Sequence, residues 1–516
     1  MKKNLPLLSG SLFLLAIVGI LEFIALRKTN GTFCYPLDDT FIHMAVAKNV
    51  ALYGNWGISP NEWVSTSSSP FYTALLALSF KLFGINSHLP FILGVLGALL
   101  AIVAMQQELN KKTRLTTNHK ALVTIITVFI GAMPALAALG MEHTFQVAFT
   151  LLFVHSSADV LTTGNSPWKK VLMAALWGAL TVITRYENAF IVAVICSLLF
   201  VRKRFLPALV IGFISALPVI LFGLYAVSKG GLFIPNSIQI KVRANYVTLL
   251  NGGLAILELA ASLSGLVVLS GVLIVRKQVQ ERFDRSAWIL LIFLLSSLIH
   301  AVFGGFGWFY RYEAYLIVLG SFHLLILFYQ WLEGGARRYH AHFALLLGAA
   351  LACTVNLPLR SLNSCRNFSR STYNIYEQQY QVALFLSRFY NHRTVAANDI
   401  GAISYLGQVN IIDLWGLGSN EVTKARKGNY WNADFLQKFV LENKADIAVV
   451  YESWFPSKLI ANWKKVGTWE VSYSHMLGDT KVSFYAIDQN KADELKNNLE
   501  QFSTQLPSDV KVEYTK

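Results

Sequence analysis

The sequence predicts a polytopic α-helical membrane protein with about eleven transmembrane helices, followed by a C-terminal extracytoplasmic α/β domain. The first observation is the composition: of 516 residues, 54% are hydrophobic and 14% are charged. Soluble domains typically have roughly 45–50% apolar residues and about 25% charged residues. The second is a series of long apolar runs, and the third is a change to polar composition near residue 358. The net charge of +15 lies largely in short loops between apolar runs, which is typical of membrane topology. We therefore expect no nucleic-acid partner.

Eleven apolar runs are candidates for transmembrane helices, since a helix needs about 20 residues to cross the lipid. The first is too long for a signal-peptide core of roughly 7–15 residues, so we expect it to be retained. Two shorter runs, the fifth and sixth, are interpreted as a hairpin. The runs are residues 6–26, 86–106, 121–139, 144–161, 168–183, 188–201, 206–227, 254–276, 287–303, 314–331 and 342–357.

The charges of the loops predict the topology, because Lys and Arg are enriched in loops that stay in the cytoplasm. Basic stretches occur at 110–120, 168–170, 202–204, 276–285 and 336–338. All of them face the cytoplasm, together with the amino terminus, if both short runs cross and the apolar stretch 70–83 does not. We therefore predict that 70–83 is a helix in the outer interface. The carboxyl end is then outside.

We predict two domains, residues 1–357 in the membrane, with 29–85 as an outer-face loop, and residues 358–516 outside it. In the second domain, "TVAAND", "IGAISYLG" and "VNIIDLWG" indicate strand, helix and strand. Asp399 and Asp413 lie at the ends of these strands, and "KADIAVVYES" indicates another buried strand. This alternation predicts an α/β sheet.

Two adjacent carboxylates, Asp38 and Asp39, follow the first apolar run. One of them could cap the helix predicted for "TFIHMAVAKNVALY", which Gly54 would end. A cap needs only one carboxylate, and a carboxylate at the lipid surface can act as a general base toward a hydroxyl group. His43 lies four residues after Asp39, on the same helix face. It would orient a carboxylate or a phosphate, or else be a solvated interface residue.

Other loops predicted to lie outside carry cations, carboxylates and aromatic side chains. The cations are Arg185, Lys241, Arg243 and Arg311. Any one of them is better explained as a snorkelling interface residue, but four on one face favour the binding of a phosphate leaving group. Glu142 and Glu187 could pair with Arg185 or Arg311, because a charge near lipid needs a partner. Tyr310 and its aromatic neighbours fit the interfacial belt by default.

The cysteines do not predict a metal site, because their spacing matches no metal-binding pattern. Cys196 and Cys353 lie in apolar runs and are expected to be inert. Cys34 and Cys365 could both face the outside and form a disulfide.

The stretch "DDTFIHMAVAKNVALYGNWGISPNEWVSTSSSPFYTALLAL" resembles the GT-C superfamily of membrane glycosyltransferases, which take sugars from polyprenyl-phosphate carriers. The likeness is to the bacterial arabinofuranosyltransferase-like branch and, more distantly, to protein mannosyltransferases. "GMEHT", "TRYEN", "GLFIPNSIQIK", "YRYEAYL" and "VAANDIGAISYLGQVNIIDLWGL" resemble further elements of this branch, in the same order. Two departures are Tyr186, where proline is usual, and His143, which separates Glu142 from Thr144.

The resemblance implies an inverting glycosyltransferase of the GT-C type in the bacterial cytoplasmic (inner) membrane. It would move a sugar from a polyprenyl-phosphate donor to a hydroxyl of a cell-envelope glycan, lipid or protein on the outer face. Asp38 would be the catalytic base, and Asp39 would orient it or bind the donor. A divalent cation is not required, although two carboxylates and His43 would permit one. Substrate-binding residues would be His43, Glu142, Arg185, Glu187, Asn236, Lys241, Arg243, Tyr310 and Arg311.

Three alternatives stay open at the level of the sequence. The first is a transporter or flippase of lipid-linked sugars, although transporters usually carry charges near mid-membrane and contain internal repeats. The second is a different outer-face transferase, such as an O-antigen ligase-like or phosphoethanolamine-type enzyme. The third is a non-catalytic assembly subunit. The clustering of the notable charges at one membrane boundary favours the glycosyltransferase.

Overall fold

The computed structural model of the chain describes residues 4–60, 62–164, 166–240, 263–279, 283–333, 354–455, 458 and 460–515. The chain forms two compact units, which are described separately. The first comprises residues 1–21, 91–221 and 243–366, and the second comprises residues 22–90, 222–242 and 367–516. The second unit therefore joins the C-terminal part of the chain to the segment 22–90, which follows the first apolar run.

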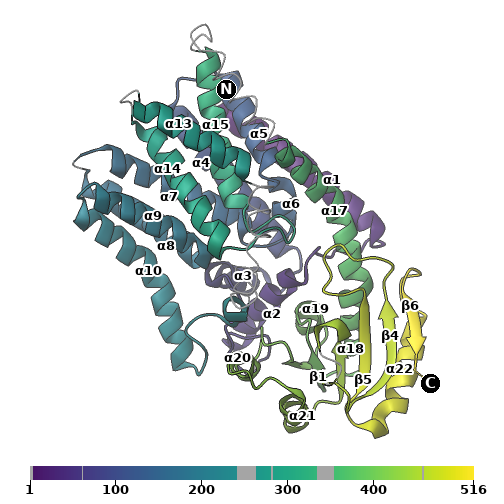
Figure 1. Cartoon of the computed structure of the whole chain (residues 1–516). Helices are drawn as coiled ribbons and strands as arrows, with labels where there is room; N and C mark the ends of the chain where they lie inside the picture. The colour runs from purple at the N-terminus through teal and green to yellow at the C-terminus, as the bar shows by residue number, and fades with distance from the viewer. Residues whose placement is uncertain are drawn as a thin grey trace. The chain divides into compact units, whose positions relative to one another are not determined.

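The first unit is helical (Figure 1). Helix α7 packs against α8, α14 and α15, and α14 also packs against α9 and α13. The apolar core of the unit lies between these helices. Its elements, including four helices that have residues in both units, are α1 (Leu5–Lys28), α4 (Leu89–Lys112), α5 (Thr117–Ile130), α6 (Met133–Ala138), α7 (His143–Thr162), α8 (Trp168–Thr184), η2 (Tyr186–Asn188), α9 (Ala189–Val201), α10 (Phe205–Ser228), α13 (Ser264–Val279), α14 (Arg285–Phe303), α15 (Ala314–Glu333) and α17 (Asn356–Ile375).

Within the described part of the chain, six helices are long and apolar enough to cross a membrane, namely α1, α4, α7, α10, α14 and α15. The protein is thus a multi-pass membrane protein. Helices α5 and α9 also coincide with predicted runs, although they are shorter. Residues 254–262 and 342–353, which belong to two further predicted runs, lie outside the described residues. The total of about eleven spans stays a prediction.

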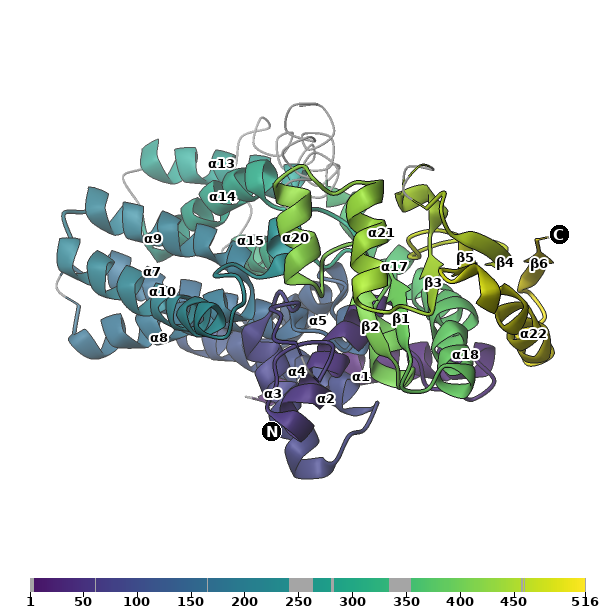
Figure 2. The same ribbon diagram turned by 90° about the horizontal axis from the view of Figure 1, so that it is seen from below.

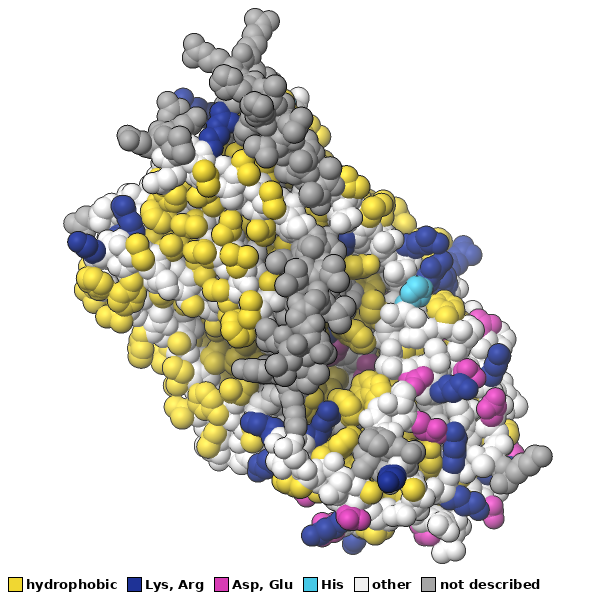
Figure 3. All heavy atoms as spheres, in the orientation of Figure 1, with side chains coloured by type: hydrophobic (Ala, Val, Ile, Leu, Met, Phe, Trp, Pro, Cys, Tyr) yellow, Lys and Arg dark blue, Asp and Glu magenta, His cyan; other side chains and the backbone are white. Residues whose placement is uncertain are grey.

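The surface of the helical unit has the composition expected of a lipid-facing protein. Figure 3 shows hydrophobic side chains spread over the visible face of the bundle. On α10 the side chains of Leu209, Phe213 and Leu224 are each more than half exposed. Apolar side chains in such numbers are costly in water but favourable in hydrocarbon. On the C-terminal α/β part of the chain, by contrast, Figure 3 shows acidic and basic side chains mixed together.

The second unit begins with two helices whose ends follow the sequence signals. Helix α2 (Asp38–Tyr53) ends at Gly54, which has a φ of 68°, and the amide of Gly54 donates to the carbonyls of Asn49 and Val50. Helix α3 (Pro70–Phe83) begins after Ser69, whose side chain accepts a hydrogen bond from the amide of Tyr72. Its 14 residues are fewer than the roughly 20 that cross a membrane, which agrees with the prediction that 70–83 does not span.

A six-stranded sheet forms the centre of the second unit, with the order β2-β1-β3-β5-β4-β6. Strand β1 pairs in parallel with β2 and with β3, and the remaining pairs are antiparallel. The predicted strand, helix, strand and later strand are all confirmed, as β1, α19, β2 and β3. The bounds are β1 (Thr394–Ala397), α19 (Gly401–Leu406), β2 (Asn410–Asp413), β3 (Ile447–Val450), β4 (Lys464–Glu470), β5 (Lys481–Ala486) and β6 (Lys511–Tyr514).

Helices cover both faces of this sheet, as Figure 2 shows for α18 and α21. One apolar core joins α18, α19 and α22 to the sheet and also receives Ile42 and Val46 from α2. A second core joins α20 and α21 to the opposite face. The helix bounds are η4 (Tyr376–Tyr380), α18 (Gln381–Phe389), α20 (Asn420–Lys427), α21 (Ala433–Glu442) and α22 (Ala492–Ser503).

The disulfide considered from the sequence is not formed, because Cys34 and Cys365 are both free thiols. Cys34 is buried, and burial raises the pKa of its thiol. A buried thiol with a raised pKa is unreactive. Cys34 is therefore a small apolar core residue in this fold.

Candidate active site

Asp38 and Asp39 lie in the first turn of α2, where negative charge is favoured by the helix dipole. The residue that precedes the helix is Leu37, and no side-chain hydrogen bond caps this end. The expectation that one of the two aspartates caps α2 is therefore wrong. The helix begins one residue too early for Asp38 to serve as its cap.

The carboxylate of Asp38 instead contacts the amino end of α19. Its Oδ2 accepts a hydrogen bond from the amide of Gly401 at 2.6 Å, and its Oδ1 accepts one from the amide of Ala402 at 2.7 Å. The approach is so close that a Cβ at position 401 would lie 2.2 Å from the backbone oxygen of Asp38. Glycine at 401 is what allows two segments more than 360 residues apart in the sequence to meet.

A second carboxylate, Asp399, reaches Asp38 from the loop after β1. The two carboxyl groups are hydrogen bonded to one another. Burial, the negative charge of Asp399 and this hydrogen bond raise the pKa of Asp38 well above its usual value, although the amides of Ala402 and Gly401 oppose the shift. A raised pKa makes Asp38 a stronger base than an ordinary aspartate.

Asp399 is itself held by side chains from two other elements. Its Oδ2 accepts hydrogen bonds from the Tyr451 hydroxyl at 2.9 Å and from Nε2 of Gln379 at 2.7 Å. The Tyr451 hydroxyl also contacts Oε1 of Gln378 at 2.7 Å. The sequence places Asp399 at a strand end but does not connect it to Asp38. The position of Asp399 directly after a buried strand marks it as a candidate functional residue, but its contact with Asp38 depends on the tertiary structure.

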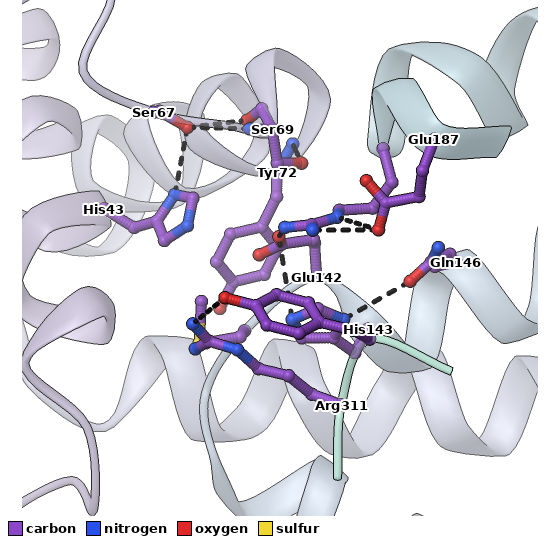
Figure 4. A network of polar contacts seen from close by, with 12 residues as sticks. His43, Ser67, Ser69, Tyr72, Glu142, His143, Gln146, Glu187 and Arg311 are labelled. Atoms are coloured by element: carbon purple, nitrogen blue, oxygen red, sulfur yellow. Dashed lines mark hydrogen bonds and ion pairs between the residues drawn. The ribbon is translucent and has the colours of Figure 1, made fainter. Parts of the chain in front are cut away.

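His43 is buried in α2, with 3% of its surface exposed. Its Nδ1 lies 2.9 Å from Oγ1 of Thr73 and 3.2 Å from Oγ of Ser67. Figure 4 shows the ring directed at Ser67, beside Ser69 and Tyr72. The expectation of a solvated interface residue is therefore wrong. His43 joins α2 to the start of α3, and its part in substrate binding stays a prediction.

Asn236 is also fully buried, in the segment that follows α10. Its Nδ2 donates to the carbonyl oxygen of Ser419 at 3.2 Å and to Oγ1 of Thr423 at 2.8 Å. Its backbone amide donates to the carbonyl oxygen of Ser65 at 3.0 Å. These contacts tie the segment to the start of α20. Lys241 and Arg243, the cations that follow in the sequence, lie outside the described residues.

In the helical unit, Arg185 lies between two carboxylates. Its Nη1 is 2.8 Å from Oε1 of Glu142, and its Nη2 is 2.8 Å from Oε1 of Glu187. The guanidinium also lies 5.6 Å from the ring centre of Tyr312. Figure 4 shows Glu142 and Glu187 together with the neighbouring His143 and Gln146. The pairing of both glutamates with Arg185, which the sequence left as an alternative, is present.

Arg311 is 1% exposed and follows a strained turn. Its Nη1 contacts the sulfur of Met141 at 2.9 Å and its Nη2 contacts the hydroxyl of Tyr312 at 3.2 Å. The preceding residues, Gly307 to Tyr310, all have positive φ, and Trp308, Phe309 and Tyr310 are not glycine. Positive φ is costly in such residues and is often found at functional sites.

A buried ion pair that the sequence does not predict holds this turn. Arg360 contacts Oε1 of Glu313 at 3.1 Å, and Oε2 of Glu313 accepts a hydrogen bond from the amide of Gly307 at 3.1 Å. Arg360 also donates to the carbonyl oxygen of Tyr310. No sequence signal joins Arg360 to the loop at 304–314, because two predicted spans, 314–331 and 342–357, lie between them.

No group of three or more His, Cys, Asp or Glu side chains is arranged to hold a metal ion in the parts of the chain that the structure describes. The oxygens of Asp38 are also engaged by two amides and by Asp399. The divalent cation therefore stays an untested prediction, and no reaction step is assigned to it.

The architecture defines a class: a multi-pass helical membrane protein with a pair of carboxyl groups where the start of α2 meets a loop of an α/β sheet. Residues 372–485 match the family model described as a domain of unknown function (DUF8728). No curated protein matches the chain. The DUF8728 segment contains Asp399 and Tyr451, so the residues that hold Asp38 belong to it.

The chain is similar in fold to several solved structures. The chain is similar to ArnT from Cupriavidus metallidurans bound to undecaprenyl phosphate, with 11% identity, 93% of this chain and 98% of that chain covered, and a TM-score of 0.55. For ArnT in the apo state the identity is 12%, the coverage is 93% of this chain and 98% of that chain, and the TM-score is 0.50. AglB from Archaeoglobus fulgidus, in complex with an inhibitory peptide and a dolichol-phosphate, has 12% identity, 97% and 75% coverage, and a TM-score of 0.44, too low to carry an argument. The likeness to ArnT confirms the GT-C-like fold, and the fold alone.

Proposed function

We propose that the protein is an inverting GT-C glycosyltransferase that moves a sugar from a polyprenyl-phosphate donor to a hydroxyl of a cell-envelope acceptor. The observation that carries the proposal is the Asp38 carboxylate, which lies just after the first span and is only partly buried. Asp38 is held by two amides and by a second carboxyl group. Holding a base in one orientation is what general base catalysis requires.

In the proposed reaction, Asp38 takes the proton of the acceptor hydroxyl. The acceptor oxygen then forms a bond to the anomeric carbon of the sugar. On the opposite face of that carbon, the bond to the phosphate oxygen breaks, and polyprenyl phosphate leaves with the bonding electrons. Attack opposite to the leaving group inverts the anomeric configuration. General base assistance of this kind contributes roughly 10²–10⁴ in rate.

The cations of the chain have different parts in this proposal. Arg185 already contacts two carboxylates, Glu142 and Glu187, so we assign those two glutamates and Arg185 to the hydroxyls of the sugar. Arg311, buried beside Tyr312, is assigned to the phosphate, as are Lys241 and Arg243. A cation in a site with little water stabilises the charge that develops on the leaving phosphate.

The location is part of the proposal. We place the protein in the bacterial cytoplasmic membrane, with the amino terminus inside and the C-terminal α/β sheet outside, because the basic loops are then cytoplasmic. The acceptor could be a glycan, a lipid or a protein, since an acceptor hydroxyl is the only group that the chemistry requires.

The test is transfer by the full-length protein in proteoliposomes. Synthetic polyprenyl-phosphate pentoses and hexoses are supplied with candidate acceptors, and released polyprenyl phosphate is measured. We expect the variant Asp38→Asn to lose at least about 10²-fold in turnover, while its thermal unfolding stays cooperative. The exposed carboxylate Asp488 provides the control, because Asp488→Asn should keep wild-type turnover.

Two results would contradict the proposal. The first is wild-type turnover by Asp38→Asn, which would remove the assigned base. The second is movement of the intact lipid-linked sugar across the bilayer without any release of polyprenyl phosphate, which would favour a flippase.

A further inference from the structure

The sheet of the second unit contains a topological switch point between β1 and β3. After β1 the chain forms α19, which packs with α18 and α22 in the apolar core on one face of the sheet. It later reaches β3 through α20 and α21, which belong to the apolar core on the opposite face. Strand β1 pairs with β2 on one side and with β3 on the other. In open α/β sheets, the crevice beyond the carboxyl ends of two such strands is the usual place for a ligand.

In this protein the crevice is too small for a ligand of the usual kind. It is lined by Asn398 and Asp399 after β1, by Tyr451 after β3, and by Gln378 and Gln379. The cavity measures about 10 Å³, and a single water molecule needs roughly 10–15 Å³. A sugar or a nucleotide does not fit there.

A side chain of the chain itself contacts the residues next to this crevice. Asp38, from the start of α2, contacts the amides of Gly401 and Ala402 beyond the end of β1. It is also hydrogen bonded to Asp399. The carboxylate that we propose as the base therefore lies against the residues that follow β1, next to the part of the sheet that commonly holds a ligand.

We propose that Asp399 is a positioning residue for Asp38, and that the two carboxyl groups share one proton whose loss makes Asp38 available as a base. The inference rests on the proposed function in one respect, the role of Asp38 as the base. The sharing of a proton between the two groups does not depend on it.

The hydrogen bonds around the pair decide which group carries the proton. A hydrogen bond between two carboxyl groups requires that one of them is protonated. Asp399 accepts hydrogen bonds from Tyr451 and Gln379, whereas burial and the neighbouring charge raise the pKa of Asp38. The shared proton is therefore on Asp38 at low pH. Once it is lost, two adjacent negative charges make Asp38 a stronger base, in line with its raised pKa.

The proton balance of the step follows from this arrangement. Before the reaction both carboxylates are ionised. Asp38 then takes the acceptor proton, and the pair again holds one proton between Asp38 and Asp399. Release of that proton to water restores the starting state. No other reactant is required.

Other titratable groups lie on the elements packed around the pair, and all of them except Tyr451 are kept unchanged in the tests. They are Cys34 before α2, Asp39, His43 and Lys48 on α2, Tyr72 and Lys81 on α3, Tyr405 on α19, Glu377 and Tyr380 on η4, and Tyr451 after β3.

The first test is the pH dependence of kcat/KM for the full-length protein in proteoliposomes. In the wild type the acid limb reports the loss of the shared proton. Asp399→Asn removes the neighbouring charge, so we expect the acid limb to move to lower pH by about one unit or more, with a lower plateau because Asp38 is a weaker base. Tyr451→Phe removes a donor to Asp399 and should move the limb to higher pH.

The matched control is Asp413, the aspartate at the end of the neighbouring parallel strand β2. Its carboxylate accepts hydrogen bonds from the amides of Trp415 and Gly418, so Asp413→Asn should lower stability without moving the acid limb. A limb that stays in place in Asp399→Asn and Tyr451→Phe would overturn the inference and leave Asp399 a purely structural residue.

The second test needs no activity. Thermal unfolding of the wild type, Asp38→Asn, Asp399→Asn and the double variant is compared over a pH series that starts near the ordinary aspartate pKa of about 3.9 and rises from there. Because the folded pKa of Asp38 is raised, its contribution to stability is present at low pH and is lost as the pH rises through that value. We expect the wild-type Tm to fall with rising pH more steeply than the Tm of either single variant.

The two tests separate the inference from the proposed function. A coupling between Asp38 and Asp399 that changes with pH supports the shared proton even if no donor is ever turned over. A coupling that is the same at every pH overturns it even if the protein proves to be a glycosyltransferase.

Discussion

At the scale of single residues, the buried pair Arg360 and Glu313 shows how a charge is kept inside a membrane protein. Arg360 is 6% exposed and Glu313 is fully buried. Both partners make further hydrogen bonds to the backbone, at Tyr310 and Gly307 respectively. A buried ion pair of this kind is costly to break, since the remaining partner is left as a buried unpaired charge.

We expect Arg360→Met to lower the free energy of unfolding by about 3–5 kcal/mol, the usual cost of removing one member of a buried pair. The measurement is thermal unfolding of the purified protein in detergent. The double variant Glu313→Gln/Arg360→Met is the control, because it removes both charges and should recover part of the loss. An unchanged Tm in the single variant would show that the pair does not stabilise the turn before Arg311.

The residues around Asp38 also show the limit of reasoning from local sequence. Asp38 and Asp39 are adjacent, and the helix expected beside them is present as α2. The choice of Asp38 as the side chain that contacts α19 could not be predicted, because the partner amides lie more than 360 residues away. The part of Asp39 in orienting the base or binding the donor stays a prediction.

At the scale of elements, α19 is the link between the C-terminal sheet and the proposed base. It has six residues, and its first amides are the donors to Asp38. Helix α2 packs against α19 and α3. A short helix is thus held in place by contacts on its side and by a carboxylate at its end.

We predict that Gly401→Ala displaces Asp38 and lowers both stability and turnover. The added Cβ would lie 2.2 Å from the backbone oxygen of Asp38 and 2.5 Å from its Oδ2, so one of the two segments must move. Overpacking of this kind costs about 1–3 kcal/mol. Thermal unfolding and the polyprenyl phosphate release assay would both report the change.

Gly164 provides the control for this substitution, since a Cβ at that position has no neighbour within 4 Å. Gly164→Ala should leave both Tm and turnover unchanged. Equal behaviour of the two alanine variants would show that the close approach between Gly401 and Asp38 does not matter for stability or function.

Most of the elements were predictable, because their signals are local. The serine and proline at the start of α3 and the glycine after α2 mark helix ends for steric and hydrogen-bonding reasons that act within a few residues. The sequence patterns that predict the buried strands of the sheet also act over only a few residues. The turn at 307–310, with three non-glycine residues at positive φ, was not predictable, since nothing in those residues favours it.

At the scale of the whole molecule, the distribution of charge predicts which ends of the spans are cytoplasmic. Lys170, in the basic stretch at the start of α8, is exposed, as is Lys438 on α21. In the proposed topology the first is inside the cell and the second is outside.

This topology can be tested with single cysteines in a protein that lacks the four native ones. We expect Lys438→Cys to react with a membrane-impermeant maleimide in intact spheroplasts. Lys170→Cys should react only after permeabilisation. The reverse pattern would place the C-terminal sheet in the cytoplasm and would exclude a site on the outer face.

The sequence by itself determined that the protein is a multi-pass membrane protein, where many of its helices and strands lie, and that its C-terminal part is an α/β sheet. These properties follow from hydrophobicity, turn residues and side-chain patterns, which act over short stretches of chain. Only the tertiary structure decided that Asp38 meets Gly401, Ala402 and Asp399, that Glu313 meets Arg360, and that His43 is buried against Ser67 and Thr73. The physical reason is that hydrogen bonds and ion pairs between distant segments depend on how the chain folds back on itself. The order of residues along the chain does not show which distant segments come close together.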